Sequence, residues 1–92
     1  MAKKLPISVC ICTLNSYKNI KQCIESVFRN QISEVVVVDG GSTDGTLETL
    51  KEFRDNVGED KVTVLEKPWQ HDFEIQKNFA LDNTKEEWRV LI

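Results

Sequence analysis

The chain has 92 residues, of which 40% are hydrophobic and 29% are charged, and its formal net charge is −3. This length suits one small domain over residues 1–92, and the composition is that of a globular protein. Lysine and arginine are scattered, so the sequence does not predict a nucleic-acid-binding surface. No apolar run approaches the roughly 20 residues that a membrane-spanning helix needs.

The first apolar run, ISVCICTL at 7–14, has the length of a strand. Two lysines precede it, as in a signal peptide, but Asn15 ends the run early and no small-residue cleavage site follows. We therefore expect the first strand of a cytoplasmic protein. Cys10 and Cys12 lie two apart and face the same side, and with Cys23 the thiol count is odd. This pattern favours buried, reduced thiols over a metal site.

Strands and helices then alternate. Residues 15–30 have apolar side chains at helical spacing, and Asn15 or Ser16 is expected to cap this helix. EVVVVD at 34–39 predicts a second strand, covered on both faces because it is apolar throughout. A second helix follows and stops at Gly58.

The rest of the chain repeats this alternation. KVTVLE at 61–66 predicts a short third strand, and Pro68 places a loop after it. Asp72 is expected to cap a third helix, and WRVLI at 88–92 predicts a fourth strand.

This order predicts an α/β fold, with a Rossmann-like parallel sheet between two helical layers (a three-layer αβα architecture). In such sheets, ligands bind beyond the carboxyl ends of the strands, where the strand order reverses. That rule selects residues near 13–15 and 39–42, and whatever follows Ile92.

The turn DGGSTDGT at 39–46 separates the second strand from the second helix. Asp39 has two interpretations that the residues leave open: it accepts a ring N–H of a bound base, or it accepts backbone N–H groups of its own turn. Ser42, Thr43 and Asp44 are all good N-cap residues. The glycine spacing fits neither common phosphate-binding motif, and Asp44 opposes a phosphate, so the turn does not predict a diphosphate cradle.

Other polar residues also have two interpretations. Thr13 and Asn15 can contact a base or ribose, or they can cap the next helix. Lys77 is either solvated or turned toward a diphosphate. Trp69 and His71 are most simply loop residues without a catalytic role.

Several segments in this order and spacing resemble family 2 glycosyltransferases, which have the GT-A fold and use nucleotide-diphosphate sugars. These segments are ISVCICTLN, CIESVFRNQISEVVVVDGGSTDGTLE, QKNFAL and WRVLI. The most similar subgroup is that of the lipooligosaccharide-core β-1,4-glucosyltransferases. It implies transfer of a sugar, glucose from UDP-glucose in that subgroup, to a polysaccharide or lipopolysaccharide-core acceptor with inversion.

The resemblance also implies roles for particular residues. Thr13 and Asn15 would border the nucleotide, Asp39 would bind the base with Gly41 and Ser42 beside it, and Lys77 would lie near the pyrophosphate. Ser16 and Tyr17 depart from the family, which often has acids at these positions. Gly40 stands where many members have a second acid.

The family's Asp-x-Asp motif, which binds Mg²⁺ or Mn²⁺, would follow the fourth strand, beyond Ile92. The acceptor site for a saccharide or lipid-linked substrate and the catalytic base would lie further on. We therefore expect no catalytic or metal-binding residue within 1–92 and no transferase activity from these residues alone. We also expect self-association through an exposed sheet edge. In the full-length enzyme, a location at the inner face of the membrane is compatible with this resemblance.

The alternative interpretation is a non-catalytic nucleotide-binding or interaction module with a doubly wound sheet. A nucleotidyltransferase is a third interpretation, but it needs a glycine-rich loop with a basic residue after the first strand. TLNSYKN at 13–19 does not provide one.

Overall fold

A computed structural model describes residues 5–28, 32–86 and 88–91. Strands and helices alternate along the chain as the sequence predicts. They are β1 (Leu5–Thr13), α1 (Tyr17–Phe28), β2 (Ile32–Asp39), α2 (Thr46–Val57), β3 (Val62–Glu66), α3 (Phe73–Asp82) and β4 (Trp88–Leu91). All strand pairs are parallel, in the order β3-β2-β1-β4.

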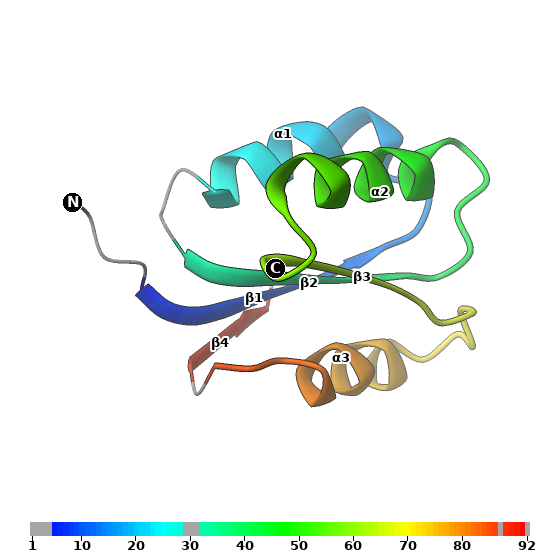
Figure 1. Cartoon of the computed structure of the whole chain (residues 1–92). Coiled ribbons are helices and arrows are strands. Elements are labelled where there is room, and N and C mark those ends of the chain that lie inside the picture. The colour runs from blue at the N-terminus through cyan, green and yellow to red at the C-terminus, as the bar shows by residue number, and fades with distance from the viewer. Residues whose placement is uncertain (1–4, 29–31, 87, 92) are drawn as a thin grey trace.

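The sheet lies between two helical layers, with α1 and α2 on one face and α3 on the other (Figure 1). The valines of β2 show why. Val35 and Val37 belong to the core under α1 and α2, whereas Val36 and Val38 belong to the core under α3. Because successive side chains of a strand point to opposite faces, a continuous apolar run requires cover on both sides. The predicted three-layer architecture is confirmed.

The strand order reverses at β1. From β1 the chain moves outward through β2 to β3, and then returns across the sheet to place β4 on the other side of β1. Thr13, the last residue of β1, pairs with Asp39, the last residue of β2. The carboxyl ends of these neighbouring strands therefore lie side by side at the same edge of the sheet. A ligand site is expected at this position in a sheet of this kind.

The helix ends agree in part with the sequence analysis. Asp72 caps α3, because its side chain accepts a hydrogen bond from the backbone N–H of Glu74 at 2.9 Å. Gly58 follows the end of α2 as predicted. The N-cap of α2 is Gly45, with no side-chain cap bond, so none of the three expected cap residues occupies that position. The three cysteines are free, but only Cys10 is fully buried; Cys12 and Cys23 are partly buried, so the expectation of buried thiols holds in part.

The buried carboxylate of Glu34, in β2, binds the segment that precedes β4. The sequence analysis treated Glu34 as part of an apolar strand. The side chain of Glu34 accepts hydrogen bonds from the Ser8 hydroxyl, at 2.5 Å, and from the backbone N–H of Lys85. The Ser8 hydroxyl in turn accepts one from the N–H of Glu86. These bonds fasten the segment before β4 to the two central strands.

One of the two edge strands, β4, is exposed along its whole length. The Trp88 side chain is 67% exposed, and Val90 and Leu91 are exposed as well. An edge strand with apolar side chains and unpaired backbone groups is a template for pairing with another chain. Within the described ranges, no helix combines the length and hydropathy that crossing a membrane requires.

We expect the 92-residue chain to self-associate through β4. Val90→Lys places a charge on this edge and should shift the chain toward the monomer, because burying an unpaired ammonium in a strand-to-strand contact is costly. Light scattering over a range of protein concentrations measures the change. Thr49→Lys on α2 is the control and should leave the association unchanged; a wild-type chain that stays monomeric at high concentration would contradict the expectation.

Candidate functional site

Backbone hydrogen bonds join the loops that leave β1, β2 and β3. The N–H of Gly40 donates to the carbonyl of Thr13 at 2.9 Å, and the N–H of Lys67 donates to the carbonyl of Asp39 at 2.9 Å. The N–H of Trp69 donates to the carbonyl of Gly40 at 3.0 Å. An added Cβ at Gly40 would lie 3.3 Å from the Cβ of Trp69, so the loops pass too closely for a larger residue to fit without movement.

The Asp39 carboxylate lies at the centre of this region and is only 1% exposed. Its Oδ1 accepts hydrogen bonds from the hydroxyls of Thr13 (2.8 Å) and Ser42 (2.6 Å). Its Oδ2 accepts from the backbone N–H groups of Gly41 (3.0 Å) and Ser42 (2.8 Å). Two donors on each oxygen account for the roughly four acceptor positions of a carboxylate.

These bonds also set the protonation of Asp39. Burial acts to raise the pKa of this carboxyl, but the hydrogen bonds from Ser42, Thr13 and Gly41 together outweigh it and hold the pKa below the ordinary value. The carboxylate is therefore ionised near neutral pH. Of the two interpretations left open by the sequence, the turn-bonding one describes the observed geometry, and a bond to a base stays a prediction.

Asn15 connects the loop after β1 to the same turn. Its backbone N–H donates to the Ser42 hydroxyl at 2.8 Å, and its side-chain Oδ1 accepts from the N–H of Thr43 at 2.9 Å. Asn15 has a φ of 51°, a left-handed conformation that asparagine tolerates better than most residues. Gly41 has a φ of 106° and nothing within 4 Å of an added Cβ, so its backbone is open to a ligand.

A second carboxylate, that of Asp44, extends these contacts to the starts of both neighbouring helices. Its Oδ1 accepts from the N–H and the hydroxyl of Thr46, and its Oδ2 accepts from the N–H of Tyr17 at 3.1 Å. The Thr46 hydroxyl also accepts from the N–H of Ser16 at 2.9 Å. The hydrogen bond from the Thr46 hydroxyl is the main reason that the pKa of Asp44 is lowered. We call the residues joined by these bonds the turn network: Thr13, Asn15, Ser16, Tyr17, Asp39, Gly41, Ser42, Thr43, Asp44 and Thr46.

Lys77 lies outside the turn network. It is in α3, and its ammonium pairs with the carboxylate of Glu74 at 2.8 Å. The structure thus brings together five of the six residues singled out from the sequence, and it places the sixth on the helix that covers the opposite face from α1 and α2.

A small apolar hollow adjoins Thr13 at the end of β1, on the side of α3. It has a volume of about 150 Å³ and is lined by Cys12, Thr13, Leu14, Trp69, Phe73 and Gln76. Burial raises the pKa of the Cys12 thiol, so this wall is uncharged near neutral pH. The sequence analysis treated Trp69 as a loop residue and did not single out Gln76. The signal available in the sequence was an aromatic residue in the loop directly before the helix that contains Gln76.

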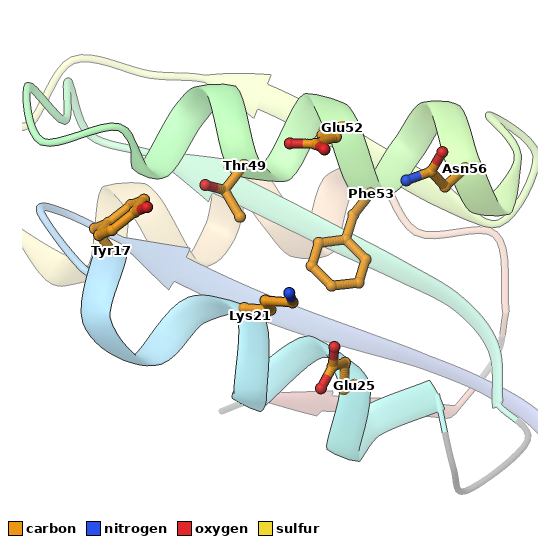
Figure 2. A pocket seen from close by; sticks show the side chains of 7 residues that line it. All are labelled: Tyr17, Lys21, Glu25, Thr49, Glu52, Phe53 and Asn56. Carbon is orange, nitrogen blue, oxygen red and sulfur yellow. The ribbon is translucent and has the colours of Figure 1, made fainter.

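A larger groove of about 350 Å³ runs between α1 and α2 (Figure 2). It is lined by Tyr17, Lys21, Glu25, Thr49, Glu52, Phe53 and Asn56. Phe53 points from α2 toward α1, and the charged side chains have both signs. All of these residues lie on the two helices, and only Tyr17, whose N–H donates to Asp44, joins the groove to the turn network.

The described residues do not fit a divalent cation. Among them, no three histidine, cysteine, aspartate or glutamate side chains gather as metal ligands. Both oxygens of Asp39 are already occupied by donors from the turn network. The metal ligands that the sequence resemblance implies would lie beyond Ile92.

The stability of the fold should depend on the charge of Asp39. The pKa of Asp39 is lowered in the folded state. The ionised carboxylate therefore contributes to the unfolding free energy above its ordinary pKa of about 4, and this contribution is lost as the pH falls through the folded-state pKa. Asp39→Asn should lower the unfolding free energy near neutral pH by about 2 kcal/mol. The reason is that an amide NH₂ group, which only donates, replaces one carboxylate oxygen that accepts hydrogen bonds. Urea unfolding between pH 3 and 7 measures both effects.

Asp82→Asn is the matched control, since Asp82 is exposed at the end of α3. It should leave the unfolding free energy near its wild-type value. Equal stability of the Asp39→Asn variant and the wild type at pH 7 would show that the bonds to Asp39 do not hold the turn.

Comparison with known proteins identifies the family. Residues 8–92 match the family model described as Glycosyl transferase family 2. A lipopolysaccharide core biosynthesis glycosyltransferase, LpsC of Rhizobium meliloti (strain 1021), is 36% identical over 88 residues, which are 96% of this chain and 31% of LpsC. The glycosyltransferase SunS of Bacillus subtilis (strain 168), derived from prophage SPbeta, is 32% identical over 83 residues, covering 89% of this chain and 18% of SunS.

A solved structure agrees with these matches. The mannosyltransferase PcManGT from Pyrobaculum calidifontis, in complex with GDP-Man and Mn²⁺, has a TM-score of 0.76 and 25% identity to this chain. The match covers 91% of this chain and 26% of PcManGT. The chain therefore spans a third or less of each of these relatives. The match over nearly all of its length shows that the chain belongs to glycosyl transferase family 2.

Proposed function

We propose that this chain forms the donor-binding part of a glycosyltransferase and binds the nucleotide of a nucleotide-diphosphate sugar. One observation carries the proposal: in a family 2 chain, the turn network lies at the carboxyl ends of β1 and β2, beside the reversal of strand order. Ligands of such sheets bind at that position. The relative PcManGT, whose structure contains GDP-Man, supports a nucleotide sugar as the ligand.

In this proposal the nucleotide lies across Thr13, Asn15, Gly41 and Ser42, with Asp39 beneath them. The open backbone at Gly41 allows a close approach. Asp39 shapes this surface, because its carboxylate fixes the orientation of the Ser42 hydroxyl and of two N–H groups. The adjoining hollow provides apolar walls for a planar base.

The diphosphate lies toward Lys77. The ammonium of Lys77 is paired with Glu74 on the helix surface, and exposed pairs of this kind are weak. A diphosphate carries more charge than one carboxylate and therefore competes well for the lysine. Asp44 adds a negative charge to the turn, which makes a cationic partner for the diphosphate more important.

The wider function extends the same proposal. A uridine diphosphate sugar, with glucose as the sugar, would be transferred with inversion to a saccharide or lipid-linked acceptor. The name of LpsC supports a lipopolysaccharide-core acceptor, and the Mn²⁺ of PcManGT supports a divalent cation in the full-length enzyme. We place this reaction in the cytoplasm, at the inner face of the membrane.

The direct test is titration of the 92-residue chain with UDP, UMP, GDP and ADP, followed by NMR. We expect weak binding, strongest for UDP, with shifts concentrated at residues 13–15, 40–43 and 76–77. Absence of binding, or shifts confined to the groove between α1 and α2, would remove the nucleotide from the strand ends. Transfer or hydrolysis of UDP-glucose by this chain would contradict its expected inactivity.

Lys77 gives a second test of the same proposal. Lys77→Met should weaken UDP binding about tenfold and leave uridine binding nearly unchanged, because only the diphosphate uses the ammonium. Glu74→Gln should strengthen UDP binding, since it releases Lys77 from its pair. Isothermal titration at two salt concentrations measures these differences. Lys51→Met on α2 is the control, and a similar loss for uridine and UDP would place Lys77 away from the phosphates.

A further inference from the structure

Three of the exposed large hydrophobic side chains meet at the apolar hollow beside Thr13. Leu14 is 45% exposed, Trp69 is 36% exposed and Phe73 is 48% exposed, and all three line the hollow. They come from the loop after β1, the loop after β3 and the first turn of α3. Large apolar side chains that gather at one place on a surface mark a binding site, whereas scattered ones do not.

None of the residues that line the hollow carries a charge. The other wall residues are Cys12, Thr13 and Gln76, and burial raises the pKa of the Cys12 thiol, which keeps it protonated. A phosphate therefore meets no cation in the hollow, whereas the flat face of a base is largely apolar and suits these walls. Because Thr13 also donates to Asp39, the hollow adjoins the turn network.

Contacts on several sides hold the loop that carries Trp69. The N–H of Trp69 donates to the carbonyl of Gly40 at 3.0 Å, and the carbonyl of Lys67 accepts from the side chain of Gln76 at 2.9 Å. The indole also makes an edge contact with the His71 ring, with centroids 6.2 Å apart and planes at 69°. These contacts restrict Trp69 before a ligand arrives, which lowers the entropic cost of binding.

We propose that Trp69 is the aromatic platform on which the base of the bound nucleotide stacks in the hollow. The indole is the largest aromatic surface in the wall, and its exposure leaves it accessible to a ligand. Stacking tolerates any base, because every base has a flat π-face. Trp69 therefore contributes affinity for the nucleotide and does not select the base. The inference rests on the proposed nucleotide-binding function and adds the residue that holds the base.

Intrinsic fluorescence tests this contact directly. The chain has two tryptophans, so the Trp88→Phe variant reports on Trp69 alone. A base stacked on the indole should quench this fluorescence, and titration with uridine and with UDP should each give quenching that saturates. Inorganic pyrophosphate, which has no base, should leave the fluorescence unchanged. The midpoint of quenching should match the dissociation constant from isothermal titration.

Substitution of Trp69 gives an independent measurement. Trp69→Ala should weaken the binding of uridine and of UDP by the same factor, about tenfold, because both ligands stack through the base. This equal loss separates Trp69 from Lys77, whose substitution affects UDP alone. Trp69→Phe keeps an aromatic face and should restore most of the affinity. Trp88→Ala, on the exposed strand β4, is the matched control and should leave both affinities unchanged.

Thermal unfolding checks that each variant is folded; if Trp69→Ala does not fold, the fluorescence of Trp88→Phe still decides the question. Three results would overturn the assignment: unchanged Trp69 fluorescence at saturating UDP, equal quenching by pyrophosphate and UDP, or a loss in Trp69→Ala that uridine does not share. In each case an anionic or nucleotide ligand still binds, so the proposed function survives. A wild-type chain that binds no nucleotide would refute the proposed function, and this inference with it.

Discussion

The buried carboxylate of Asp39 is the group on which the candidate site depends. Removing this charge from water is unfavourable, and four hydrogen bonds offset the cost by holding the end of β1 and the turn after β2 in one arrangement. Two of these bonds come from hydroxyls and two from backbone N–H groups. The turn is therefore shaped from within the protein, and its form does not require a ligand.

Asp44 continues this arrangement in the adjacent loop. It binds the backbone at the start of α1 and the backbone and hydroxyl at the start of α2, so one carboxylate aligns two helices that follow different strands. Two ionised acids then lie within six residues of each other, near the place proposed for a diphosphate. The proposed diphosphate would meet this repulsion, and a cation such as the Lys77 ammonium would offset it.

Much of the fold was predictable, because hydrophobic periodicity reports burial and burial sets the elements. The four valines of β2 and the cap at Asp72 are examples. The sequence predicted turn bonding by Asp39 only as one of two alternatives, because the choice depends on the left-handed conformation of Gly41 and on the orientation of the Ser42 hydroxyl. Gln76 was missed for a related reason: a polar residue in an amphipathic helix is usually solvated, and only the packing of the loop at Lys67 against α3 shows that it is buried.

Thr13 links the two halves of the site, because its hydroxyl donates to Asp39 and the same residue lines the hollow. A change at Asp39 is therefore transmitted through Thr13 to the wall of the hollow. Protonation of Asp39 weakens its bonds to the N–H groups, so the turn and the adjoining wall of the hollow loosen together. The proposed nucleotide site shares these bonds, so the proposal links nucleotide affinity to fold stability, and both are expected to decline as the pH falls through the lowered pKa of Asp39.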